Sequence, residues 1–165
     1  MALVRGNAVV EDPFTNLAGR EDIPSSGAII VDLEQWRANR DALAGRADPV
    51  GIRLRSDQPP ELIAAELGFL DMVALEFPAF KDGRAYSYAR LLRDQYGYTG
   101  EIRAVGDVLL EQLHFMERTG FDAFELDSDD PLRDLQIARS EFDVWYQPSA
   151  DGRMTAIELR HQRGG

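Results

Sequence analysis

The sequence of 165 residues contains no cysteine and only two histidines, His114 and His161. Without cysteine, the chain has no disulfide framework, no thiol nucleophile, no Cys-x-x-Cys redox pair and no thiolate-bound zinc or iron–sulfur site. Two histidines are too few for a histidine-rich metal site, so we predict no metal centre. Any redox chemistry would require a carrier that dissociates from the protein.

Several common motifs and targeting signals are also missing. The sequence has no Gly-x-Gly-x-x-Gly dinucleotide fingerprint, no lysine-bearing P-loop and no Gly-x-Ser-x-Gly element. No apolar run reaches about 18 residues, and the first residues lack the apolar core of a signal peptide. We therefore expect a cytoplasmic protein without a membrane partner.

Basic residues are scarce, with 18 against 29 acidic ones, for a net charge of −11. This charge repels nucleic acid, which we exclude as a partner. Residues 81–103 run against the trend, because they contain five basic and three acidic side chains. Residues 120–134 contain six acidic side chains and one arginine. A locally basic stretch therefore lies in the middle of the chain.

The length and a hydrophobic content of 44% are typical of one globular domain. Short apolar runs alternate with stretches of helical periodicity, a pattern that favours parallel βα units. We predict an α/β fold in a single domain, with a small, mainly parallel sheet built from repeated βα units. Its shape is either an open three-layer sheet or a partial barrel. Residues 1–26 form an N-terminal strand and loop extension, residues 27–147 the α/β domain, and residues 148–165 a C-terminal tail or hairpin.

The individual elements are predicted from apolar runs and helix-capping residues. Asp32 is a helix N-cap, Gly45 ends that helix, and Pro59-Pro60 and Asp130-Pro131 begin helices. Gly106-Asp107 opens a helix that runs to Gly120. The predicted strands cover residues 4–10 (a strand or hairpin), 27–31, 51–55, 71–77, 101–105 and 122–126.

Ligands of parallel sheets bind at the carboxyl ends of the strands, which places the loop at residues 77–84 in a functional position. Asp82 and Gly83 suit the start of a helix, whose N-terminus favours anions. Arg84, Arg90 and Arg93 add positive charge, and this combination predicts a site for a small oxyanion. The alternative is a solvated helix face in which these arginines pair with Asp82 and Asp94.

Two further groups of residues extend this candidate site. Phe80 is the aromatic residue that we expect to be exposed, because it lies in the loop. Asp107 is either a helix cap or a catalytic carboxylate. The predicted anion- or partner-binding residues are Phe80, Lys81, Asp82, Gly83, Arg84, Tyr86, Ser87 and Arg90, and the candidate catalytic residues are Asp82, Arg84 and Asp107.

The central motif resembles a known family. The residues that carry the resemblance are Phe77-Pro78-x-Phe80-x-Asp82-Gly83-Arg84-x-Tyr86-Ser87-x-Ala89-Arg90-x-Leu92-Arg93, then Gly100-Glu101-Ile102-Arg103-Ala104-Val105-Gly106-Asp107-Val108, Gln112 and residues 120–126. They are similar to the bacterial domain-of-unknown-function family numbered 934. This resemblance implies a role in sulfur assimilation, since such proteins are described as probable oxidoreductases or accessory proteins of sulfite reduction. It implies no catalytic residue.

The leading hypothesis is an accessory protein of assimilatory sulfite reduction that binds a small oxyanion or a reductase partner through residues 77–93. Its partners would be sulfite reductase or neighbouring sulfur-assimilation enzymes, and no bound cofactor is predicted. The alternative is a stand-alone oxidoreductase that uses a dissociable flavin or nicotinamide on a small anionic substrate. In that case Asp82, Arg84 and Asp107 would take acid–base and oxyanion-binding roles.

Overall fold

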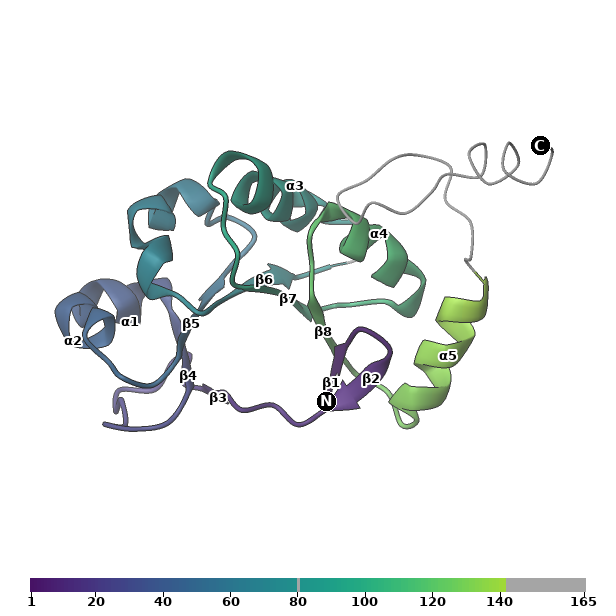
Figure 1. The fold of residues 1–165 in the computed structure, drawn as a ribbon, viewed down its shortest axis with the longest axis horizontal. Helices are drawn as coiled ribbons and strands as arrows, with labels where there is room; N and C mark the ends of the chain where they lie inside the picture. Colours follow the sequence, from purple (N-terminus) through teal and green to yellow (C-terminus); the bar gives the residue numbers. More distant parts are fainter. Residues whose placement is uncertain (80, 142–165) are drawn as a thin grey trace.

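A computed structural model describes residues 1–79 and 81–141. These residues form one α/β domain around an eight-stranded sheet with the strand order β2-β1-β8-β7-β6-β5-β4-β3 (Figure 1). The sheet is mainly parallel, as predicted, and it is curled into a half-barrel. The strands are β1 (Ala2–Arg5), β2 (Ala8–Val10), β3 (Thr15–Asn16), β4 (Ile29–Asp32), β5 (Val50–Leu54), β6 (Met72–Phe77), β7 (Glu101–Gly106) and β8 (Ala123–Leu126).

Strands β3 to β8 run parallel to one another, whereas β1 is antiparallel to both β8 and β2. The hairpin of β1 and β2 turns at Gly6, whose φ of 57° suits glycine. The N-terminal residues are therefore part of the sheet. The short strand β3 lies in a stretch that the sequence predicted to be a loop.

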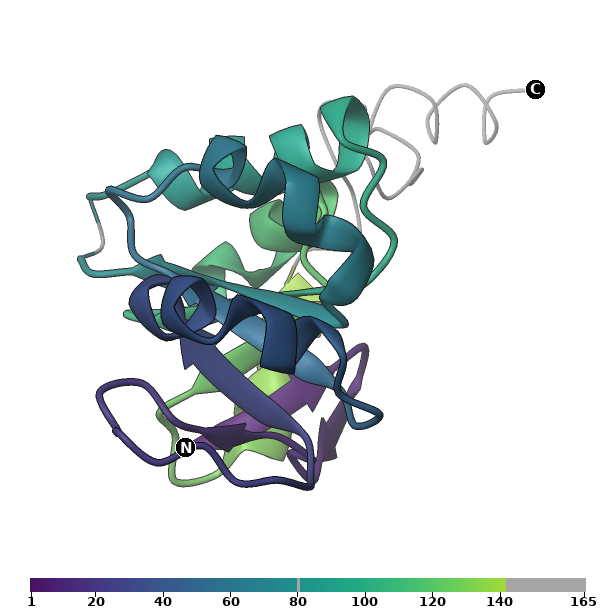
Figure 2. The ribbon, with the colours of Figure 1, turned by 90° about the vertical axis from the view of Figure 1, so that its left-hand side faces the viewer.

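Helical segments cover the outer face of the curled sheet, as Figures 1 and 2 show for α1 and α3. Asp32 caps α1 through a complete capping box with Gln35, as its position in the sequence predicts. The helical segments are α1 (Leu33–Ala38), α2 (Arg40–Ala44), the 3₁₀ helix η1 (Pro60–Phe69), α3 (Arg84–Arg90), its π-helical continuation η2 (Leu91–Gln95), the 3₁₀ turn η3 (Leu110–Gln112), α4 (Leu113–Thr119) and α5 (Pro131–Glu141).

The main core lies between these segments and the outer face of the sheet. Alternate strand residues such as Val31, Ile52 and Val73 are fully buried there against Trp36 and Leu92. Each such side chain stabilises the fold by ~1.5–3 kcal/mol through burial. The residues between them point to the opposite, inner face, because side chains alternate along a strand.

The inner face is closed by a short connection that we call the strap, residues 11–14. The strap joins β2 to β3, although these strands form opposite edges of the sheet. Five Cα–Cα steps span at most about 19 Å, whereas eight strands in a flat sheet would extend over about 34 Å. The sheet must therefore curl until its edges approach each other, which is the reason for the half-barrel.

Two sequence predictions need comment. The helix predicted from Gly106-Asp107 is wrong at its start, because η3 begins only at Leu110. Gly106 is instead the last residue of β7 with a φ of 90°, and the Asp107 N–H donates to the Phe77 carbonyl at 2.7 Å. The predicted C-terminal tail, residues 148–165, lies outside the described residues. Within the described residues, no helix has both the length and the apolar character needed to cross a membrane.

Candidate functional site

The predicted loop lies at the carboxyl end of β6, and two of its charged residues, Asp82 and Arg84, form a closed network with Ser56. Asp82 Oδ1 accepts hydrogen bonds from the Arg84 backbone N–H at 3.1 Å and from its Nε at 3.0 Å. Arg84 Nη2 donates to Asp82 Oδ2 at 2.6 Å and to Ser56 Oγ at 2.9 Å. Since Ser56 follows β5, this network joins the ends of two neighbouring strands.

The network sets the charge state of both partners. Hydrogen bonds from the Arg84 side chain and backbone hold the pKa of the Asp82 carboxyl well below its usual range. The pKa of Arg84 is raised by its hydrogen bond to Asp82. The Tyr88 hydroxyl donates to the Ser56 carbonyl at 2.7 Å and fastens the same loop from the other side. Arg84 is thus held in one orientation, and a carboxylate of the chain occupies its Nε–Nη2 edge.

The remaining predicted binding residues lie at the start of α3. Gly83 is the N-cap, Ser87 is exposed, and exposed Arg90 lies 3.9 Å from Asp94. Lys81 is exposed, while Phe80 lies outside the described residues. The pairing of Arg84 and Arg90 with neighbouring carboxylates agrees with the solvated-face alternative.

An aromatic ladder adjoins this loop. Tyr86 is half-buried and makes an edge contact to Phe77, with ring centroids 5.1 Å apart. On its other side Tyr86 contacts Phe115 of α4 at 4.8 Å. Phe115 is 54% exposed, so the ladder ends at the protein surface. We call Lys81, Asp82, Arg84, Tyr86, Ser87, Arg90 and Phe115 together the rim surface. The sequence analysis missed Phe115, because nothing in its local pattern separates it from a core residue.

Asp107 does not join this network. Its side chain is exposed at the end of β7. In the part of the chain that the structure describes, no hydrogen bond or ion pair links Asp107 to Asp82 or Arg84. The three candidate catalytic residues therefore form one pair and one separate carboxylate.

Two arginines of the basic stretch are engaged inside the protein. Arg93 donates to the carbonyls of Tyr98, Gly100 and Gly120 at 2.6, 2.9 and 3.1 Å. Arg103 on β7 is fully buried on the inner face. The excess positive charge of residues 81–103 is therefore not a continuous patch at the surface.

Arg103 is the centre of an ionic network inside the half-barrel. Its Nη1 and Nη2 donate to the two oxygens of Asp12 at 2.7 and 3.2 Å, and its Nε donates to Glu101 at 3.0 Å. The ring of Phe14 lies 5.6 Å from the guanidinium carbon. Burial alone would lower the pKa of Arg103, but the bonds to Asp12 and Glu101 outweigh it and the net direction is upward. Asp12 and Phe14 therefore bind the strap to the sheet.

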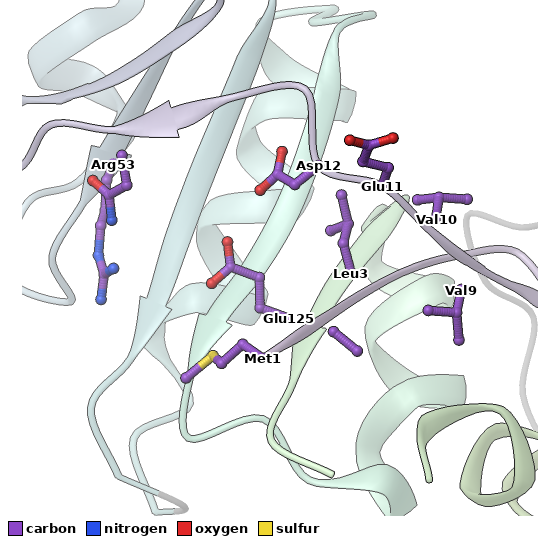
Figure 3. A pocket seen from close by; sticks show the side chains of 10 residues that line it. Met1, Leu3, Val9, Val10, Glu11, Asp12, Arg53 and Glu125 are labelled. Atoms are coloured by element: carbon purple, nitrogen blue, oxygen red, sulfur yellow. The ribbon is translucent and has the colours of Figure 1, made fainter. Parts of the chain in front are cut away.

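A hollow of about 690 Å³ opens beside this network (Figure 3). It is lined by the strap and by residues near the carboxyl ends of the parallel strands, including Asn16, Arg53 and Glu125. Arg53 pairs with Glu76 at 3.2 Å. Such a mouth is where ligands of parallel sheets bind.

The sequence analysis missed this hollow, although one signal pointed to it. Arg53, Glu76, Arg103 and Glu125 stand at alternate positions within otherwise apolar strands. That period, together with the strand register, places all of their side chains on the inner face. The inner face is therefore polar in part, beside a small apolar cluster of Ile30, Met72, Ala74 and Val105.

The sequence profile of a bacterial family, described as a bacterial protein of unknown function (DUF934), matches residues 51–157. The chain belongs to the DUF934 family. The matched range contains β5 to β8, the rim surface and Arg103. The first two strands, the strap and β3 precede the range shared with DUF934. A comparison with curated proteins finds no match.

Proposed function

We propose that this protein is an accessory protein of assimilatory sulfite reduction, and that its rim surface docks onto sulfite reductase or a neighbouring sulfur-assimilation enzyme. The resemblance of residues 77–126 to the family implies the pathway. The observation that carries the docking surface is the exposed ring of Phe115 on Tyr86 of α3, the helix that begins with the fixed and exposed Arg84.

Arg84 and Phe115 each have the properties of an interface anchor. Arginine and aromatic residues carry most of the binding energy in protein interfaces. Arg84 is half-exposed yet fixed by Asp82 and Ser56, and Phe115 rests against Tyr86. Less side-chain entropy is lost on binding when the side chains are already ordered.

The geometry favours a protein partner over a free oxyanion. Oxyanions such as carboxylate and phosphate bind arginine best through two parallel hydrogen bonds, and Asp82 already occupies the Nε–Nη2 edge of Arg84 in this way. Sulfite or sulfate would have to compete with a carboxylate that stays ionised. A partner surface can instead contact the exposed part of the guanidinium, or the Phe115 ring, without displacing Asp82.

The test measures binding of the protein to purified sulfite reductase by biolayer interferometry, together with reductase turnover. We expect Arg84→Ala and Phe115→Ser each to weaken binding at least about tenfold, the loss typical of an interface anchor. Arg40→Ala is the matched control, because Arg40 is similarly exposed and also pairs with carboxylates, but it lies on α2. Unchanged binding and turnover in both rim variants would contradict the proposal.

The same preparation tests the alternative of a stand-alone oxidoreductase. A yellow protein, or saturable binding of a flavin or nicotinamide in an absorbance titration, would favour that enzyme over the accessory role. Saturable binding of sulfite that is lost in Arg84→Ala would favour the oxyanion site.

A further inference from the structure

The hollow in the half-barrel is separate from the rim surface and has its own chemistry. We propose that it binds a small organic cation, with a primary ammonium group on Glu125 and a short aliphatic chain along Leu3 and Val10. The size of the hollow, about 690 Å³, is within the range of small-molecule sites. It also opens at the carboxyl ends of parallel strands, as such sites do.

The charge comes from a surplus carboxylate among the inner-face side chains. Three arginines each have a closer carboxylate partner: Arg5 with Glu101 at 2.6 Å, Arg53 with Glu76 at 3.2 Å, and Arg103 with Asp12 at 2.7 Å. Glu125 is the fourth carboxylate of this group, and its one hydrogen bond comes from Arg103 Nη1 at 3.3 Å.

Glu125 can therefore accept a ligand. That single bond reaches Oε1, and within residues 1–79 and 81–141 no donor reaches its Oε2. The side chain is 23% exposed and lines the hollow together with Met1 and Leu3, as Figure 3 shows. The negative charge of this carboxylate attracts a cation and repels an anion, and it does so more strongly than in water because the local dielectric constant is lower.

The strand register supplies the apolar part of the site. Glu125 of β8 lies opposite Leu3 of β1, and Leu3 lies opposite Val10 of β2. Residues directly opposite in a sheet share one face, with neighbouring Cβ atoms about 5 Å apart. The three side chains thus form one row, and an ammonium on Glu125 would place a chain of about four carbons along Leu3 and Val10.

The hydrogen bonds of the inner face also argue against a metal ion. Divalent cations require several oxygen ligands, whereas both Asp12 oxygens already accept hydrogen bonds from Arg103. In the described ranges, no three acidic or histidine side chains are placed to hold a metal ion.

The experiment titrates the ¹⁵N-labelled full chain with n-butylammonium chloride and follows amide shifts by NMR, with n-butanol and sodium butyrate as probes of equal chain length. We expect butylammonium to give saturable shifts at Leu3, Val10 and Glu125, with a midpoint at least tenfold lower than that of butanol. Butyrate should give no saturable shifts there. Equal midpoints for butylammonium and butanol, or tighter binding of butyrate, would overturn the proposal.

Two variants locate the site. Glu125→Gln retains the shape of the side chain and should raise the butylammonium midpoint at least tenfold. Glu66→Gln is the control, because Glu66 has a similarly exposed side chain and one arginine partner, Arg40. If Glu125→Gln does not fold, Val10→Phe, which fills the aliphatic part of the row, should abolish the shifts. An unchanged butylammonium midpoint in Glu125→Gln, or in Val10→Phe if Glu125→Gln does not fold, would contradict the proposed site.

Discussion

The strongest energetic prediction concerns the bond between the strap and the sheet. Arg103 is fully buried, and Asp12 supplies two of its hydrogen bonds. Breaking a buried ion pair by removing one partner costs about 3–5 kcal/mol. We expect Asp12→Ala to cost about 3 kcal/mol, at the lower end, because the Asp12 side chain is 33% exposed and because Glu101 and Glu125 still neutralise the guanidinium.

Removing the arginine of this ion pair should destabilise the protein at least as much as removing the aspartate. Arg103→Met removes the cation and leaves the carboxylates of Asp12, Glu101 and Glu125 close together, which we expect to cost about 4 kcal/mol. The double variant should cost less than the sum of the single changes, with a coupling energy of about 2 kcal/mol, because the two side chains are in direct contact. Urea unfolding measures these energies, and Tm should fall by about 6–12 °C for Asp12→Ala.

Asp41→Ala is the control, because Asp41 also pairs with an arginine but its side chain is 97% exposed. We expect this change to alter stability by less than about 0.5 kcal/mol. If Asp12→Ala were equally mild, or if the energies of the Asp12 and Arg103 changes were additive, our account of how the strap is held on the sheet would be refuted.

Two further predictions test local geometry. At Gly106, whose φ is 90°, an added Cβ would lie 2.5 Å from the Phe77 carbonyl oxygen. We therefore expect Gly106→Ala to lower the free energy of unfolding, measured in urea, by about 2–4 kcal/mol. Gly68→Ala is the control and should leave this energy unchanged, because an added Cβ at Gly68 would meet nothing within 4 Å. Arg84 lowers the Asp82 pKa, so the ion pair should stabilise the protein above the ordinary carboxyl pKa of about 3.9 and lose this effect as pH falls further. A ¹³C NMR titration should show Asp82 ionised at about pH 3.9 and its pKa rising in Arg84→Gln; an ordinary pKa in the wild type would contradict the pairing.

Much of the fold was predictable because its signals are local. The apolar runs located β5, β6 and β7 to within about two residues, and Asp32 was correctly assigned as a helix cap. The start of α4 was not predictable in this way. Gly106 and Asp107 resemble a helix start, but the carbonyl of Phe77 on the neighbouring strand takes the Asp107 N–H. A partner that is distant in sequence overrode the local preference.

Part of the candidate site was likewise predictable from the sequence, and part was not. The position of the loop at a carboxyl strand end followed from the sequence, because every parallel sheet places its loops there. The pairing of Arg84 with Asp82 and Ser56 did not follow, since it depends on how β5 and β6 adjoin. The exposure of Phe115 likewise depends on how α4 packs against α3.

The sequence by itself determined the class of fold, the order of most elements and the absence of cysteine chemistry, because periodicity, caps and composition act over a few residues. Only the tertiary structure decided that the sheet curls, that the strap covers Arg103, and that Glu125 retains an open oxygen beside Leu3. These features depend on residues far apart in the sequence, such as Leu3 and Glu125, or Asp12 and Arg103, which are 91 positions apart. Their contact is set by the register of the whole sheet and not by any local pattern.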